Sequence, residues 1–199
     1  MEGEVEFFMT TECLSATDVV FKMVDDNAER CRILAKLGML RNEGLDYELA
    51  PASLELFVLK EMGVRTLPFK VISYHVSQRG VFLDSHAESV NEAIVKVSVQ
   101  GKREKSSVSD GNGAVNALDL ALRAALEEHF PILNGVGLVG YSVESLNGGK
   151  GSAAKTRVLI KTARGEDTWT SIGVSEDSIL ASLTALVDGI EYAILEGKY

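Results

Sequence analysis

The sequence predicts an α+β fold in which a βββα unit occurs twice, preceded by a small helical segment. Two stretches alternate apolar and polar side chains in three consecutive runs, as strands with one buried face do. The predicted strands are 68–78, 91–101 and 102–111 in the first unit, and 136–146, 153–163 and 166–174 in the second. A helical pattern follows each set of strands, at 114–128 and at 177–195.

The two halves align with each other along their length. Tyr74 in ISYHVS matches Tyr141 in VGYSVE, and VKVSVQG matches TRVLIKT. Self-similarity at this spacing is typical of a duplicated structural unit. We therefore expect one domain over 68–199, with repeat one at 68–130 and repeat two at 135–197, in which each helix covers the apolar face of its sheet.

The second predicted helix has one continuous apolar face. Its members recur at three- and four-residue steps and are Ile179, Leu183, Leu186, Ile190 and Ile194. Such a stripe predicts a core helix. Ser175 is the expected N-cap, with Glu176 and Asp177 in the first turn where the helix dipole favours negative charge.

Residues 1–67 differ from the rest of the chain. LSATDVVFKMV, AERCRILAKLGMLRNEG and PASLELFVLKEMG have helical patterns separated by breaker residues, and Pro51 stands where a helix favours proline. Three short helices of this kind predict a helical connector rather than an independent core.

The composition excludes several classes of protein. A net charge of -9 argues against nucleic acid and anionic membranes as partners. No apolar run is long enough to predict a membrane span, and the acidic start MEGEVEFFMTTE lacks the pattern of a signal peptide. Cys13 and Cys31 fit no disulfide or metal framework, so we expect reduced thiols in a cytoplasmic protein.

The sequence offers no recognisable catalytic centre. His75, His86 and His129 have no second histidine or cysteine at metal-ligand spacing, and no G-x-S-x-G motif occurs. NGGKGSAAKT at 147–156 lacks the phosphate-loop spacing and leads into a predicted strand. We therefore expect no catalytic residue, metal or cofactor in this chain.

One turn leaves a question open. In SDGNGAVNALDLAL, Gly111, Asn112 and Gly113 stand directly before a predicted helix. The first N–H groups of a helix have no internal partner, and an anion can bind them. The turn is therefore either a simple helix start or a binding site, and the absence of further lysine or arginine there favours a small carboxylate over a polyphosphate.

Several stretches resemble one known family. GNGAVNALDLALRAAL, LVGYSVESLNGGKGSAAKTRVLIKTA and WTSIGVSEDSILASLTALVDGIEYAIL are similar to the C-terminal regulatory domain of isopropylmalate synthases and citramalate synthases. NEGLDYELAPASLELFV resembles the helical connector before that domain, particularly in citramalate synthases. The resemblance covers roughly residues 27–197.

The resemblance implies a function. In this family the domain consists of two βββα units, forms a homodimer and binds the end-product amino acid, isoleucine in citramalate synthases and leucine in isopropylmalate synthases. Binding inhibits an N-terminal TIM barrel, which condenses acetyl-CoA with a 2-oxo acid such as pyruvate and holds a divalent metal. No H-x-H metal pair occurs here. The chain is thus expected to be the regulatory part, with isoleucine favoured as effector by its likeness to citramalate synthases.

The family's effector residues carry over position by position. They correspond to Gly111, Asn112, Gly113, Val115, Ala117, Leu138, Tyr141, Ser145, Ala153, Ala154, Thr156 and Ser178. In the expected pocket the N–H groups of 111–113 take the effector's carboxylate, and Tyr141, Leu138 and Val115 surround its branched side chain. Tyr141 could equally be a core aromatic.

The chain departs from the family pattern at two positions. Ala114 stands where the family commonly has proline, and Gly140 stands where it commonly has aspartate before the tyrosine. The missing aspartate favours a rival interpretation, in which the domain only dimerises and the pocket is vestigial.

Overall fold

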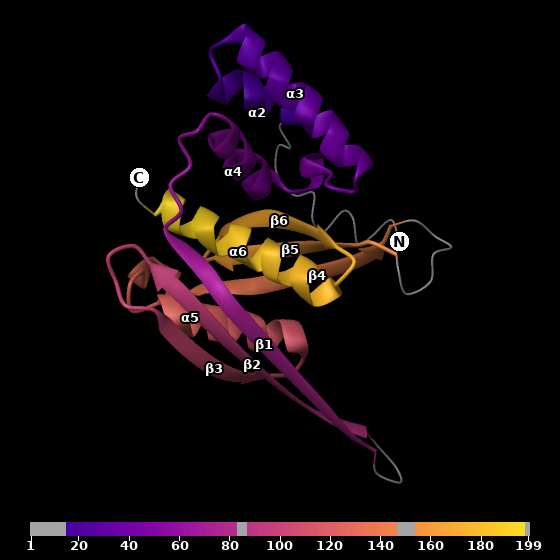
Figure 1. The fold of residues 1–199 in the computed structure, drawn as a ribbon, viewed down its shortest axis with the longest axis vertical. Coiled ribbons are helices and arrows are strands. Elements are labelled where there is room, and N and C mark those ends of the chain that lie inside the picture. Colours follow the sequence, from indigo (N-terminus) through magenta and orange to yellow (C-terminus); the bar gives the residue numbers. More distant parts are fainter. Residues whose placement is uncertain (1–14, 83–86, 147–153, 198–199) are drawn as a thin grey trace. The chain divides into compact units, whose positions relative to one another are not determined.

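The computed structural model describes residues 15–82, 87–146 and 154–197, which form two compact units (Figure 1). The first unit combines the described residues up to Thr66 with Val136–Tyr192. The second combines Leu67–Gly135 with the end of the chain from Ala193. Cys13, His86 and most of the loop at 147–156 lie outside the described residues, and Cys31 is an exposed free thiol.

The helical segment of the first unit contains α2 (Ala16–Met23), α3 (Asn27–Asn42), the 3-10 turn η1 (Tyr47–Leu49) and α4 (Pro51–Glu61). Local signals fix the helix starts. Ser15 and Asp18 form a reciprocal capping box, and Asp26 accepts a hydrogen bond from the Glu29 N–H at 2.8 Å. Pro51 occupies the first turn of α4, as the sequence predicts.

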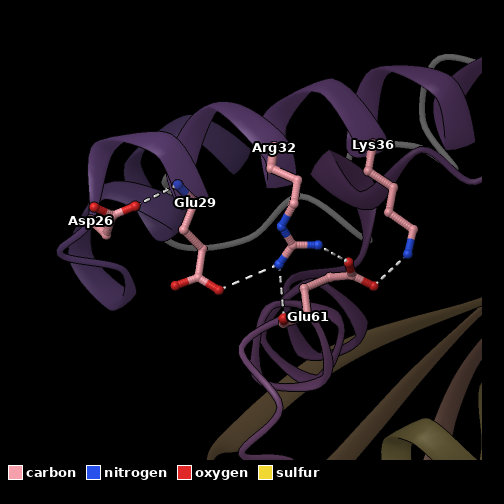
Figure 2. A network of polar contacts seen from close by, with 5 residues as sticks. All are labelled: Asp26, Glu29, Arg32, Lys36 and Glu61. Carbon is pink, nitrogen blue, oxygen red and sulfur yellow. Dashed lines mark hydrogen bonds and ion pairs between the residues drawn. The ribbon is translucent and has the colours of Figure 1, made fainter.

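The three helices share one apolar cluster. Its buried members are Ala16, Val19, Val20, Val24, Ile33, Leu37, Leu54, Phe57 and Val58. Polar contacts fix α3 against α4 at the edge of this cluster (Figure 2). Glu61, at the end of α4, accepts from Arg32 at 2.8 Å and from Lys36 at 2.6 Å. The hydrogen bond from Lys36 lowers the pKa of Glu61, so this carboxylate stays charged.

The rest of the first unit is a three-stranded antiparallel sheet with one long helix. Its strands, in the order β4-β5-β6, are β4 (Val136–Ser145), β5 (Thr156–Arg164) and β6 (Asp167–Ser175). The helix α6 (Ser178–Glu196) follows, and its residues up to Tyr192 belong to this unit. A register shift between Leu138 and Gly140 marks a β-bulge in β4.

Helix α6 lies so close to the sheet that small residues are needed at the contact. A Cβ on Gly173 would lie 2.0 Å from the carbonyl oxygen of Ala181, so only glycine fits in β6 there. Helix α6 is long and apolar enough to span a membrane by length and composition alone, but 56% of that stretch is buried inside the fold. Burial of that kind is typical of a core helix.

The second unit has the same arrangement. The strands β1 (Phe69–Phe82), β2 (Ala87–Val99) and β3 (Lys105–Gly111) form an antiparallel sheet in the order β1-β2-β3. Helix α5 (Ala114–Leu126) packs on this sheet, and η2 (Pro131–Leu133) follows it. Alternate β2 residues, Ala93, Val95 and Val97, are buried with Leu118 and Leu122 of α5.

The predicted duplication of a βββα unit is confirmed. The two units also share a bulge in their first strand, which the alternation of side chains does not predict. In β1 a bulge begins at Val71, three residues before Tyr74. In β4 a bulge begins at Leu138, three residues before Tyr141.

The predicted cap of the second helix is wrong. Asp177, not Ser175, accepts hydrogen bonds from the first-turn amides of α6.

Candidate functional site

The glycine turn of the second unit joins β3 directly to α5. Gly111 ends the strand, and Gly113 is the N-cap of the helix, with extended backbone angles and no side chain to accept from the first turn. The Gly113 carbonyl accepts the Ala117 N–H at 2.9 Å, which closes the first turn of the helix. The N-terminus of α5 therefore begins without the side-chain cap that α2 and α3 have.

The residues of this turn have different structural roles. A Cβ on Gly111 would lie 2.4 Å from the backbone nitrogen of Ala117, so this glycine lets the strand pass against the helix. At Gly113, apart from its neighbours in the chain, no atom of the described residues lies within 4 Å of the corresponding position. The Asn112 N–H already donates to Asn116 Oδ1 at 3.1 Å. The open part of the turn is thus at Gly113 and the residues that follow it.

Val115 and Ala117 lie on different sides of α5. Val115 is half-buried in the first turn, whereas Ala117 is fully buried in the core of the second unit. Of the two, Val115 is the residue that remains available to a ligand at the start of the helix.

In the first unit, Tyr141 reaches from β4 to α6. Its hydroxyl lies 3.0 Å from Ser182 Oγ, and Ser182 Oγ donates to the Ser178 carbonyl at 2.7 Å. Because serine has a single hydroxyl proton, Tyr141 is the donor in the first of these bonds. Tyr141 as a whole residue is still 42% exposed, so it is not an ordinary core aromatic.

The bulge in β4 brings Leu138 onto the same face as Tyr141. Leu138 pairs with Thr162, and Tyr141 pairs with Ile160, two positions along β5. Partners that are two residues apart lie on one face of a strand, so the extra residue in β4 restores the alternation. Simple alternation would place Leu138 and Tyr141 on opposite faces.

The other predicted positions of this unit lie toward the far end of the same sheet. Ser145 pairs with Thr156, and Thr156 pairs with Ser175 on the other side, which gives a row of three hydroxyl residues across the strands. Ala154 lies just before β5, and Ala153 is outside the described residues. Ser178 is the exposed first residue of α6.

The predicted pocket residues therefore fall into two groups. Gly111, Asn112, Gly113, Val115 and Ala117 belong to the second unit, and the positions from Leu138 to Ser178 belong to the first. Each group is assembled within its own unit. A single pocket built from both groups remains a prediction.

Sequence reasoning missed a buried polar cluster in the first unit. We call it the Arg65 cluster: Ser53 of α4, Arg65 shortly after α4, and Asp188 and Glu191 of α6. Arg65 donates to both carboxylate oxygens of Glu191 at 2.7 Å and to Asp188 at 3.2 Å. Ser53 Oγ donates to Asp188 at 2.7 Å and accepts the Ile172 N–H at 3.0 Å.

Burial sets the electrostatics of this cluster. The Glu191 side chain is 1% exposed, and those of Arg65 and Asp188 are 16% and 19% exposed. Burial raises the pKa of Asp188, and the Ser53 hydrogen bond and the Arg65 charge only partly offset this. Burial, together with the Asp188 charge, raises the pKa of Tyr47 to about 12. The signal in the sequence was an aspartate and a glutamate at i, i+3 inside an otherwise apolar helix.

Metal chemistry has no assembled ligand set in the part of the chain that the structure describes. No group of three or more histidine, cysteine, aspartate or glutamate side chains comes together there. The polar features that the described residues do form are the start of α5 without a side-chain cap, the Tyr141–Ser182 pair and the buried Arg65 cluster.

Comparison with known proteins gives a consistent match. The sequence model of the LeuA allosteric (dimerisation) domain matches residues 48–194. The chain is 37% identical over 179 residues to an (R)-citramalate synthase of Geobacter sulfurreducens, covering 90% of this chain and 33% of that protein. An (R)-citramalate synthase of Synechocystis sp. is 38% identical over 184 residues, covering 91% of this chain and 33% of that protein.

One further relative, matched over a shorter stretch, is an isopropylmalate synthase by name and not a citramalate synthase. A probable 2-isopropylmalate synthase of Methanopyrus kandleri is 36% identical over 98 residues, covering 49% of this chain and 19% of that protein. The chain thus spans about a third of the length of the curated citramalate synthases that it matches.

Proposed function

Because the chain belongs to the LeuA allosteric (dimerisation) domain family, we propose that it senses a branched-chain amino acid, with isoleucine as the effector. Its partners are then a second copy of the chain, in a homodimer, and the catalytic TIM barrel of a citramalate synthase-like acyltransferase. That enzyme condenses acetyl-CoA with pyruvate, and any divalent metal belongs to its barrel. The proposal places the protein in the cytoplasm, with no membrane or nucleic acid partner.

The observation that carries the proposal is the start of α5. Its N-cap is a glycine with open space around it, so the first-turn N–H groups have no side-chain acceptor from that residue. These groups carry partial positive charge and suit a carboxylate without any basic side chain. The half-buried Val115 adds an apolar neighbour.

The substitution Gly113→Asp tests this assignment because it is expected to change stability and binding in opposite directions. An aspartate at the N-cap accepts from the first-turn amides itself, which stabilises the helix by a few tenths of a kcal/mol relative to glycine. The same carboxylate occupies the site and repels the effector. We expect an equal or higher melting temperature and no heat of isoleucine binding.

The matched control is Ser106→Asp, which adds the same charge at an exposed position of β3. It should bind isoleucine as the unaltered chain does. In the unaltered chain, isoleucine at about 100 times its dissociation constant should stabilise the fold by about 2.7 kcal/mol. A Gly113→Asp variant that still binds isoleucine with unchanged affinity would contradict the assignment of the carboxylate site.

Two alternatives have specific support. The relationship to a probable 2-isopropylmalate synthase supports leucine as the effector. Gly140, which replaces the family's usual aspartate, supports a structural dimerisation module with a vestigial pocket. Titration calorimetry with isoleucine and leucine in parallel separates these alternatives. Binding heat with leucine alone supports leucine as the effector. A folded dimer that gives no heat with either amino acid supports the structural module.

A further inference from the structure

Helix α6 is fixed to its sheet by three hydrogen bonds along its length. Tyr141 binds Ser182 at 3.0 Å, Ser171 Oγ donates to the Ala185 carbonyl at 2.7 Å, and Trp169 Nε1 donates to the Gly189 carbonyl at 2.9 Å. At Gly173 the backbone of β6 lies directly against the backbone of α6, with no side chain between them. The helix cannot slide along the sheet without breaking these bonds, so a displacement at Ser182 is expected to move the whole helix.

The same helix holds the connector. Six residues after Ser182, Asp188 accepts from Ser53 in α4, and Glu191 holds Arg65 through both of its oxygens. The two acids lie at i and i+3 and so lie on one side of the helix. One rigid element thus carries the Tyr141 contact near its start and the Arg65 cluster toward its end.

Ser53 ties the connector to the sheet as well as to the helix. Its hydroxyl donates to Asp188 and accepts the N–H of Ile172 in the edge strand β6, and the residue is 1% exposed. Both hydrogen-bonding functions of this buried hydroxyl are therefore in use. Hydrogen exchange at the Ile172 amide therefore reports whether Ser53 of the connector is in contact with β6.

The chemistry of the cluster favours a position-sensitive contact over a purely stabilising one. Buried ion pairs seldom stabilise a fold more than apolar residues of the same size would, because desolvation offsets the attraction. A two-bond arginine–carboxylate fork, however, requires one distance and one direction. A small shift of α6 therefore weakens this contact, whereas an apolar contact would tolerate the shift.

We propose that the Arg65 cluster couples the effector to the helical segment α2–α4: contact of the effector's side chain with the exposed Tyr141 shifts α6 through the Tyr141–Ser182 hydrogen bond, and Ser53 and Arg65 transmit the shift to α4. This inference rests on the proposed function. Ser53, Arg65, Asp188 and Glu191 are positioning residues in it, since none of them needs to touch the effector. Coupling of this kind requires only that the effector favours one position of α6 over another.

The test combines titration calorimetry with amide hydrogen exchange followed by NMR on this chain. Saturating isoleucine should change the exchange rate of the Ile172 amide by about fivefold or more, the lower end of usual allosteric coupling. The Val97 amide, in the central strand of the other sheet, serves as the internal reference. In Asp188→Asn, isoleucine should still bind, but the change at Ile172 should fall below about twofold.

Two further variants keep the test decisive. Asp167→Asn makes the same acid-to-amide change at a side chain that is 77% exposed in the same unit, and should behave as the unaltered chain. If Asp188→Asn does not fold, Arg65→Lys replaces it, because lysine keeps the charge and loses the fork. Its Ile172 response should also be lost.

The outcomes separate the two levels of the proposal. Isoleucine binding with an unchanged Ile172 amide, or with an equal change in Asp188→Asn, overturns the coupling and leaves the proposed sensor intact. Absence of binding heat from either amino acid overturns both. A purely structural cluster would lower the melting temperature in the variants without altering any ligand-dependent exchange.

Discussion

Gly111 and Gly113 look equivalent in the sequence, yet the structure gives them different roles. Gly111 is required by close packing, since any side chain there would meet the backbone of α5. Gly113 lies in open space with an extended backbone that any residue adopts. Sequence reasoning predicted the turn and the helix that follows. It could not assign the two roles, because the contact with Ala117 depends on where the helix lies against the strand.

The difference can be measured by substituting each glycine with alanine. Gly111→Ala should lower the free energy of unfolding by about 2 kcal/mol or more, because the new methyl overlaps backbone atoms that cannot move away. Gly113→Ala should cost less than about 1 kcal/mol, the difference between the two residues at an N-cap. Urea denaturation of both variants checks this, and equal losses would contradict the packing role.

Tyr47 gives the first unit a dependence on alkaline pH. Burial raises the pKa of this phenol to about 12, against about 10 in an unfolded chain. The fold therefore favours the neutral phenol, so stability is intact below pH 10 and falls as the pH rises toward 12. Two pKa units correspond to about 2.7 kcal/mol at most.

The substitution Tyr47→Phe keeps the ring that stacks on Phe57 at 5.1 Å between centroids and removes the phenol. We expect the unfolding free energy of this variant to fall less steeply from pH 10 to 12 than that of the unaltered chain. Tyr74→Phe, in the other unit, is the control for losing a phenol elsewhere. Parallel curves for Tyr47→Phe and the unaltered chain would show that Tyr47 is not responsible.

At the scale of the elements, alternation and helical spacing predicted the six strands that the structure describes and the covering helix of each repeat, but they did not predict how the elements end or bend. The bulge in β4 changes which face Leu138 occupies, and no residue type marks it. The start of α6 shows the same limit. Ser175 and Asp177 are both good caps by type, and only the position of the first helical residue, Ser178, decides between them.

The cap of α6 can be tested by comparing Asp177→Ala with Ser175→Ala. Asp177 accepts from the amides of Ile179 and Leu180 at 2.8 and 3.3 Å, so its loss should cost about 1 kcal/mol. Ser175 accepts only from the Asp177 amide, outside the helix, and its loss should cost less than half of that. Thermal unfolding of the two variants checks the order, and a larger loss for Ser175→Ala would reverse the assignment.

At the scale of the whole molecule, the duplication was readable because each repeat brings its own sheet and its own covering helix. The matching bulges before Tyr74 and Tyr141 support a common ancestral unit. The Arg65 cluster was not readable, because its partners are 126 residues apart and belong to elements that the repeat does not relate. Local patterns carry no information on such a pairing, and only the assembled first unit reveals it.

The long separation between Arg65 and Glu191 has a consequence for synthesis of the chain on the ribosome. Chains grow at about 5–20 residues per second, so the 126 residues that separate the pair take roughly 6 to 25 seconds to appear. Throughout that time the connector helices have emerged without the acids and the strand edge that satisfy Arg65 and Ser53. Nascent chains paused before α6 should therefore leave Ser53 and Arg65 without their acidic partners, and the first unit should close only after residue 191 has left the exit tunnel.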